Sequence, residues 1–202
     1  MVETPYLREP GYAERYRDRR FHSGSGAQTD RRERQVLRRL LALADAPPGP
    51  WLDAPSGAGR MTDELPGDAV QADRDPAMVA ACPGNRARVS ASVHALPFAD
   101  GVFAGVLCHR LLQHIPTSVE RIDILRELRR VSHGVLIASF FDANSLPHWR
   151  RRLRRALGKN RSGRSAVARS RFRAELQAAG WRLVAMHSLR RFWSEQTLVL
   201  CR

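Results

Sequence analysis

The sequence is poor in the residues that mark a secreted, metal-binding or membrane-spanning protein. Its three cysteines, Cys82, Cys108 and Cys201, lie far apart, and no two of them have the spacing of a metal site. No apolar run reaches the roughly 18 residues that a membrane span needs, so we expect no transmembrane segment. Residues 1–20 are polar and charged, which argues against a signal peptide. These features predict reduced thiols, no metal site and a cytoplasmic protein.

Lysine is nearly absent, because Lys159 is the only lysine among 34 basic residues. With 20 acidic residues the formal net charge is +14, but an arginine bias of this kind can reflect genome base composition rather than a partner. The charge is nevertheless concentrated, since Arg150–Arg173 contains eleven basic residues and no acid. A nucleic acid, an anionic membrane surface or an acidic substrate could each use that segment, and a solvated helix and loop is an equally open interpretation.

The length of 202 residues suits one well-cored domain. We expect residues 1–28 to form an N-terminal arm or lid and residues 29–202 to form a single domain. Tyr12 and Phe21 in the arm are aromatic side chains that can stack over a pocket. Asp30 and Glu33 have the spacing of a capping box, which predicts a helix from about Asp30 to Ala44.

Apolar runs and helical patterns then alternate along the chain. Strands are predicted around 50–55, 68–73, 87–93, 102–112 and 134–141, and helices around 75–81, 118–131 and 171–179. The last two strands, 181–189 and 196–201, are too close for a crossover helix and should pair antiparallel. The pattern predicts an α/β fold with a doubly wound, mostly parallel seven-stranded sheet whose last strand is antiparallel.

The stretch "WLDAPSGAGR" joins the end of the first strand to a flexible turn that contains Gly57 and Gly59. In a doubly wound sheet, ligands lie beyond the carboxyl ends of the strands, where glycines let a ligand approach the backbone. Asp73 ends the second strand and can accept hydrogen bonds from both hydroxyls of a ribose. Thr62 stands where a dinucleotide motif has its third glycine, and no P-loop lysine follows. S-adenosylmethionine is the remaining common cofactor.

These motifs resemble those of class I S-adenosylmethionine-dependent methyltransferases of the small-molecule type, and their layout is similar to the ubiquinone/menaquinone-biosynthesis methyltransferases. The resemblance runs from roughly Val36 to the C-terminus and also rests on "AVQADRDPAMV", "HALPFADGVFAGVLCHRLLQHI" and "SRFRAELQAAGWRLVAM". It implies a Rossmann-like methyltransferase fold, S-adenosylmethionine as cofactor and a small-molecule acceptor. The resemblance also implies a set of cofactor-binding residues. For the methionine part of the cofactor they are Asp53, Ala54, Gly57, Gly59 and Arg60, and for the ribose Asp73. For the adenine they are Arg74, Ser92 and Val93, and beside the sulfonium Cys108, His109 and Arg110.

Two positions depart from the family pattern. Pro55 replaces the first glycine of the motif, and Ser92 replaces the acid that usually faces the adenine. A catalytically degenerate, methyltransferase-like subunit that acts as a binding partner is therefore the alternative function. His94, His109 and His114 are expected to lie on loops that meet at the pocket mouth, with His114 as the candidate base toward the acceptor.

The basic segment Arg150–Arg173 indicates which kind of acceptor the protein uses. Trp149, Leu153 and Leu157 have helical spacing among arginines, which favours an anionic or membrane-associated acceptor. An RNA-modifying methyltransferase is a further hypothesis from the charge. Nucleic acid is disfavoured because the chain has no separate RNA-binding module and no N/D-P-P-Y/F signature.

Overall fold

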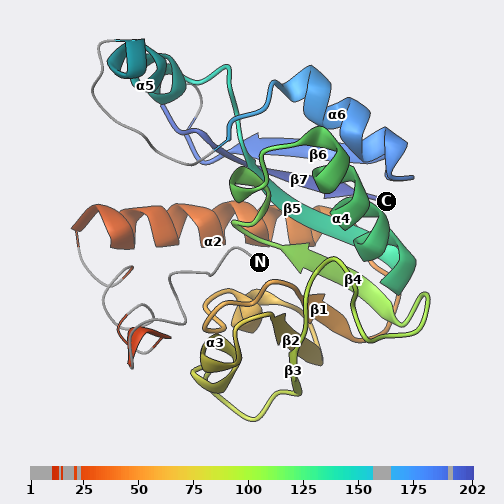
Figure 1. The fold of residues 1–202 in the computed structure, drawn as a ribbon. Helices are drawn as coiled ribbons and strands as arrows, with labels where there is room; N and C mark the ends of the chain where they lie inside the picture. The colour runs from red at the N-terminus through yellow and green to blue at the C-terminus, as the bar shows by residue number, and fades with distance from the viewer. Residues whose placement is uncertain (1–10, 14, 16–20, 22–23, 157–164, 191–192) are drawn as a thin grey trace.

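A computed structural model describes residues 11–13, 15, 21, 24–156, 165–190 and 193–202. A seven-stranded sheet, in the order β3-β2-β1-β4-β5-β7-β6, forms its centre (Figure 1). The strands are β1 (Trp51–Asp53), β2 (Ala69–Asp73), β3 (Arg88–Ser90), β4 (Phe103–Cys108), β5 (Ser132–Phe141), β6 (Leu183–Ser188) and β7 (Gln196–Cys201). The helices are α2 (Gly24–Ala44), α3 (Pro76–Ala80), α4 (Ser118–Val131), α5 (Leu146–Ala156) and α6 (Arg169–Ala178), with short 3-10 turns η2 (Thr62–Glu64) and η3 (Leu112–His114).

The sheet confirms the predicted topology. Strands β1 to β5 pair in parallel, whereas β7 runs antiparallel to both of its neighbours, β5 and β6. The carboxyl ends of β1, β2, β4 and β5 therefore share one edge of the sheet with the start of β7. The candidate functional site lies at this edge of the sheet.

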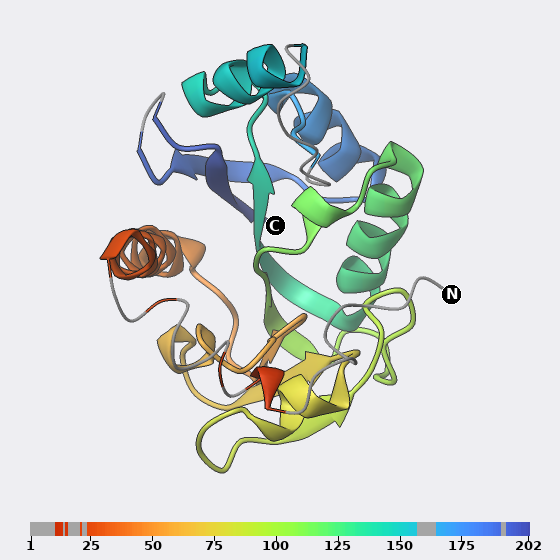
Figure 2. The same cartoon turned by 60° about the vertical axis from the view of Figure 1, so that its left-hand side comes forward.

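Helices cover both faces of the sheet (Figure 2). On one face α2 packs Val36, Leu37 and Leu40 against the sheet, and on the other face α4 and α6 close the larger part of the core. Phe140 of β5 stacks on Phe172 of α6, with ring centroids 4.1 Å apart. Helices α2, α4 and α6 each bury an apolar stripe, which is the main source of their stability in a layered fold.

Helix α4 occupies the residues expected for it, and a side-chain cap defines its N-terminal end. The side-chain oxygen of Thr117 accepts a hydrogen bond from the backbone N–H of Glu120, and Ile124, Leu125 and Leu128 are fully buried. Asp75 caps α3 in the same way, with Pro76 in the first turn.

Helix α2 differs from its prediction. It begins at Gly24 rather than near Asp30, so the capping role predicted for Asp30 and Glu33 is wrong. The physical reason is that both carboxylates, which lie within the helix, pair with arginines from other parts of the chain. The division into an arm of residues 1–28 and a domain of 29–202 stays a prediction, although residues 24–28 belong to α2. In the described part of the chain, no helix is long and apolar enough to cross a membrane.

Candidate functional site

The glycine turn after β1 contains two glycines that meet different surroundings. Both have positive φ, +55° at Gly57 and +73° at Gly59, a conformation that suits glycine. A Cβ atom added at Gly57 would have nothing within 4 Å. At Gly59 it would lie 2.6 Å from Nε2 of Gln71 and 3.1 Å from Sγ of Cys82. Gly59 is therefore required by packing on β2, whereas the face of Gly57 is open.

Asp73, at the end of β2, lies against the open glycine. Its Oδ2 accepts the N–H of Gly57 at 2.9 Å, and its Oδ1 accepts the N–H of Asp75 at 3.0 Å. Burial raises the pKa of Asp73 above its ordinary value, although the amides of Asp75 and Gly57 act in the opposite direction. No ion pair of Asp73 is found among the described residues. The carboxylate thus holds the turn at the carboxyl edge of the sheet, where doubly wound folds generally bind ligands.

Asp53, at the end of β1, lies beneath the turn. Its Oδ2 accepts the hydroxyl of Thr62 at 2.6 Å, and Thr62 in turn accepts Nε2 of Gln71 at 2.9 Å. Burial raises the pKa of Asp53 to about 7, and the charge of Asp73 adds to this effect. Asp53 therefore supports the turn through a buried chain of hydrogen bonds, and a direct contact with the cofactor stays a prediction. Ala54 beside it is fully buried, and its backbone N–H donates to the carbonyl of Leu107.

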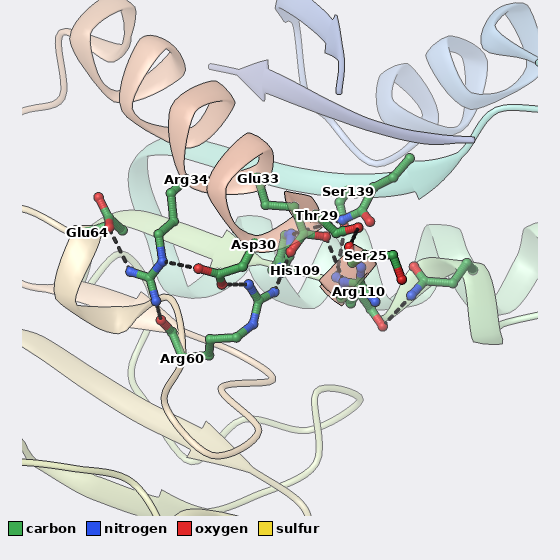
Figure 3. Close-up of polar contacts among 12 residues, drawn as sticks. Ser25, Thr29, Asp30, Glu33, Arg34, Arg60, Glu64, His109, Arg110 and Ser139 are labelled. Carbon is green, nitrogen blue, oxygen red and sulfur yellow. Dashed lines mark hydrogen bonds and ion pairs between the residues drawn. The ribbon is translucent and has the colours of Figure 1, made fainter. Parts of the chain in front are cut away.

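A cluster of charges joins α2 to the loops after β1 and β4 (Figure 3). Glu33, which has no exposed surface, accepts hydrogen bonds from Arg60 at 2.6 Å and from Arg110 at 2.7 Å. Asp30 pairs with both Arg60 and Arg34. Burial acts to raise the pKa of Glu33, but the interactions with His109, Arg60 and Arg110 outweigh it and the pKa is lowered. The cluster fixes the N-terminal half of α2 across the ligand-binding edge.

This cluster gives Arg60 a role that the sequence did not suggest. Arg60 was predicted to bind the cofactor, which stays a prediction, and its guanidinium binds two carboxylates of the chain. The ring of Phe21 lies 4.0 Å from the guanidinium carbon of Arg60, and Tyr12 packs beside Ala58 of the glycine turn. The described part of the N-terminal segment thus covers this turn, while Tyr6 and Tyr16 lie outside the described residues.

Cys108, the last residue of β4, and the two residues that follow it have distinct environments. Cys108 is buried and its pKa is raised to about 12 by burial, which makes it a core residue rather than a nucleophile. His109 is buried beside Glu33 and Gln196, with 3.0 Å between its Nε2 and Nε2 of Gln196. Burial lowers the pKa of His109 to about 3, so its imidazole is neutral at physiological pH.

Arg110 has the positive φ of +59°, which is uncommon for a residue with a side chain. Two bonds hold it there: its N–H donates to Oγ of Ser139 at 2.7 Å, and its side chain donates to Glu33. A backbone in this conformation persists only where the surroundings fix it, and such positions cluster at functional sites.

The remaining predicted residues do not all converge. Ser92 and Ala95 form a tight bridge in which Oγ of Ser92 accepts the N–H of His94, and Val93 belongs to the core. Arg74 is exposed at the end of β2. Of the three histidines expected at one pocket mouth, His94 lies against Glu120, His109 is buried, and His114 is exposed at the end of η3.

A cavity of about 300 Å³ opens at the same edge of the sheet. It is lined by Thr29, Arg32, Phe141, Pro147, Leu189, Arg190, Trp193, Ser194, Glu195 and Gln196. It thus lies between α2, the end of β5 and the turn that joins β6 to β7. A larger cavity of about 670 Å³ lies between α6 and the start of β6, at the opposite edge, and has no part in this site.

Sequence reasoning missed the residues that link these parts. Glu33, Asp30 and Gln196 were not proposed as site residues, yet they contact Arg60, Arg110 and His109. The one available signal was a pair of acids on a helix otherwise rich in arginine.

Comparison with known proteins identifies the domain. Residues 52–138 match the family model of the methyltransferase domain, and no curated protein matches the chain. The magnesium protoporphyrin IX methyltransferase of Synechocystis PCC 6803, solved with bound SAH, superposes with a TM-score of 0.76 at 18% identity, over 97% of this chain and 95% of that one. A possible histamine N-methyltransferase from Thermotoga maritima superposes with a TM-score of 0.65 at 12% identity, covering 85% and 89% of the two chains.

A third structure, the complex between the Haloferax volcanii Trm112 methyltransferase activator and a putative methyltransferase, matches with a TM-score of 0.67 at 13% identity and covers 100% of this chain and 98% of that chain. At these identities the structures establish the fold, and the family match covers the glycine turn, Asp73 and the loop after β4. Residues 52–138 thus match a methyltransferase domain, and the chain has the fold of S-adenosylmethionine-dependent methyltransferases.

Proposed function

We propose that the chain transfers a methyl group to a small anionic acceptor, with the cofactor held along the glycine turn. The observation that carries this proposal is the open face of Gly57 beside the carboxylate of Asp73. A second carboxylate oxygen nearby, Oδ2 of Asp75, is buried and has no hydrogen-bond partner among the described residues. An open backbone, a ribose acceptor and a spare acceptor atom suit an adenosyl group. When bound, the cofactor supplies a methyl group on an activated sulfonium.

Most of the predicted residues then have a place in the proposal. Asp73 would accept the ribose hydroxyls, with Arg74, Ser92 and Val93 on the adenine side. Glu33 fixes Arg110 beside the glycine turn, and the neutral His109 forms a wall that carries no charge near a cationic sulfonium. The side chains of Asp53 and Arg60 are engaged within the protein, and we propose that they also position the glycine turn for the cofactor.

The acceptor is proposed to occupy the cavity of about 300 Å³ at the same edge. Phe141 and Trp193 offer apolar walls, and Arg32 and Arg190 line the same cavity with positive charge. Arginine binds carboxylates and phosphates through its planar array of donors. This lining favours a small acceptor with an apolar body and an anionic group.

We propose His114 as the group that takes the proton from the acceptor. It ends η3, directly after the loop that follows β4, and its imidazole is exposed rather than buried. Histidine is the side chain that most often serves as a general acid or base in enzymes, and an exposed imidazole is accessible to an acceptor. The three free, buried cysteines support the cytoplasm as the compartment.

A labelling experiment tests the proposal. The purified chain is incubated with S-adenosylmethionine that carries a deuterated methyl group, together with a metabolite extract and its lipid-soluble fraction. Mass spectrometry should find an anionic product heavier by one labelled methyl group. The Gly57→Ala variant serves as the matched negative control. Absence of any labelled product from either fraction would contradict methyl transfer to a small molecule.

A further inference from the structure

Helix α5 carries its apolar residues on the side that faces away from the protein. Leu146, Trp149 and Leu153 are three and four residues apart, which places them on one face of the helix. They are 42%, 59% and 64% exposed. Soluble helices usually bury such a face. Arg151, on the other side of α5, pairs with Glu195 and lies 6.0 Å from the ring centre of Phe141, so the polar side of the helix faces the domain.

The turn between β6 and β7 extends this apolar surface. Trp193 is 56% exposed, and the guanidinium of Arg150 lies 5.8 Å from its ring centre. Four of the eight large hydrophobic side chains that are exposed in the described residues thus belong to α5 and this turn. Trp193 and Pro147 of α5 also line the acceptor cavity, so the apolar surface is continuous with the cavity mouth. Both views show α5 at the outer end of the molecule (Figures 1 and 2).

Positive charge surrounds the exposed apolar face. Arg150 and Arg152 flank it and are exposed, and the sequence from Arg150 to Arg173 contains no acid. Exposed tryptophan and leucine bordered by arginine are the features of a helix that lies in the plane of a membrane interface. Each basic residue near an anionic leaflet strengthens binding, and the tryptophans suit the headgroup level.

We infer that α5 and the β6–β7 turn dock this enzyme on an anionic lipid bilayer, with the mouth of the acceptor cavity facing the membrane. This inference rests on the proposed function only for the identity of the cavity. A second copy of the chain is a poor occupant, because two such surfaces would bring their arginines together. Nucleic acid is also a poor occupant, since phosphate binding leaves Trp149 and Leu153 in water.

Vesicle binding tests the inference without any methyl transfer. The full chain is mixed with phosphatidylcholine vesicles, with or without phosphatidylglycerol, and bound protein is separated by flotation. We expect binding only to the anionic vesicles, with a blue shift of tryptophan fluorescence that is reduced in Trp149→Phe. Arg150→Gln with Arg152→Gln should weaken binding about thirtyfold, from the usual contribution of each basic residue at an anionic surface. Trp149→Ser with Leu153→Ser should weaken it at least about tenfold.

Matched variants separate docking from a general loss of charge or apolar surface. Val119→Ser removes an apolar side chain that is 70% exposed on α4, and Arg39→Gln with Arg126→Gln removes two exposed charges elsewhere. Both controls should bind vesicles like the wild type. Equal binding to neutral vesicles, or unchanged binding by the α5 variants, would overturn the inference.

Two further outcomes would also overturn it. In one, the wild type binds tRNA but not vesicles, and Arg150→Gln with Arg152→Gln abolishes the tRNA binding. In the other, the wild type is a dimer in solution, and Trp149→Ser with Leu153→Ser dissociates it. Calorimetry of S-adenosylmethionine binding is done on the same preparations. A protein that binds the cofactor but no vesicles contradicts only the docking, whereas a protein that binds vesicles but no cofactor contradicts only the proposed methyl transfer.

Discussion

Alanine substitutions at the two glycines of the turn should affect different properties. Gly57→Ala places a methyl group in open space, so the change in folding free energy comes from backbone strain alone, about 1–2 kcal/mol for a left-handed residue. Gly59→Ala adds a steric conflict to the same strain, because the new Cβ would lie 2.6 Å from Nε2 of Gln71. Moving Gln71 disrupts its buried hydrogen bond to Thr62, at a further cost of about 1–3 kcal/mol.

The two variants should therefore separate in a combined assay of stability and binding. Urea unfolding is expected to show Gly59→Ala less stable than Gly57→Ala by roughly 1–3 kcal/mol. Calorimetry is expected to rank the affinities for S-adenosylmethionine in the opposite way. Gly57→Ala should bind the cofactor more weakly than Gly59→Ala, and at least about tenfold more weakly than the wild type. Gly67 also has positive φ, +63°, and open space around it, so Gly67→Ala is the control for strain without loss of affinity.

One combination of affinity and stability results would refute the proposed position of the cofactor. If Gly57→Ala keeps full affinity while Gly59→Ala keeps full stability, the open face of Gly57 is not where the cofactor lies. Equal losses of stability in all three variants would contradict the packing role of Gly59.

Three other predictions concern the charged groups of the site. Because the pKa of Asp53 is raised to about 7 from an ordinary 3.8, the folded state retains a proton between these pH values that the unfolded state loses. Stability should accordingly fall as pH rises through that range, and urea midpoints of Asp53→Asn should lack this decline. Glu33→Gln leaves Arg60 and Arg110 without their shared carboxylate and should lower the unfolding free energy by about 2 kcal/mol, measured by urea titration. Arg31→Gln, at an exposed site on the same helix, is the control. If both variants lose the same stability within error, Glu33 does not have the bridging role. His114→Ala should lower kcat about a hundredfold without weakening S-adenosylmethionine binding, and an unchanged pH–rate profile would argue against it as the base.

Most of the fold could be predicted because its signals are local. Alternating apolar runs and helical patterns indicated a parallel sheet, and the short connection before residue 196 required an antiparallel end. The bounds of α4 followed from the apolar spacing of the helix. The beginning of α2 did not, because Gly24 and Ser25 are poor helix formers. Thr29 donates to the carbonyl of Ser25, and tertiary contacts of the helix outweigh the weak propensity.

The candidate site could be predicted only in part, for a related reason. The positions of Gly57 and Asp73 follow from where strands end, which a sequence reveals. The pairing of Glu33 with Arg110 joins residues 77 positions apart, and no local pattern specifies it. Asp30 and Glu33 also have the spacing of a capping box, so the same letters allowed a local interpretation that the tertiary pairs replace.

Titration calorimetry with the wild type and Asp73→Ala tests the central claim most directly. Urea unfolding first verifies that the variant is folded, since Asp73 also accepts the N–H groups of Gly57 and Asp75. We expect saturable binding of S-adenosylmethionine by the wild type and at least about tenfold weaker binding by the variant, because hydrogen bonds to a charged acceptor contribute about 1.5–3 kcal/mol. No heat from the wild type at millimolar cofactor, or equal affinity in a folded variant, would contradict the account.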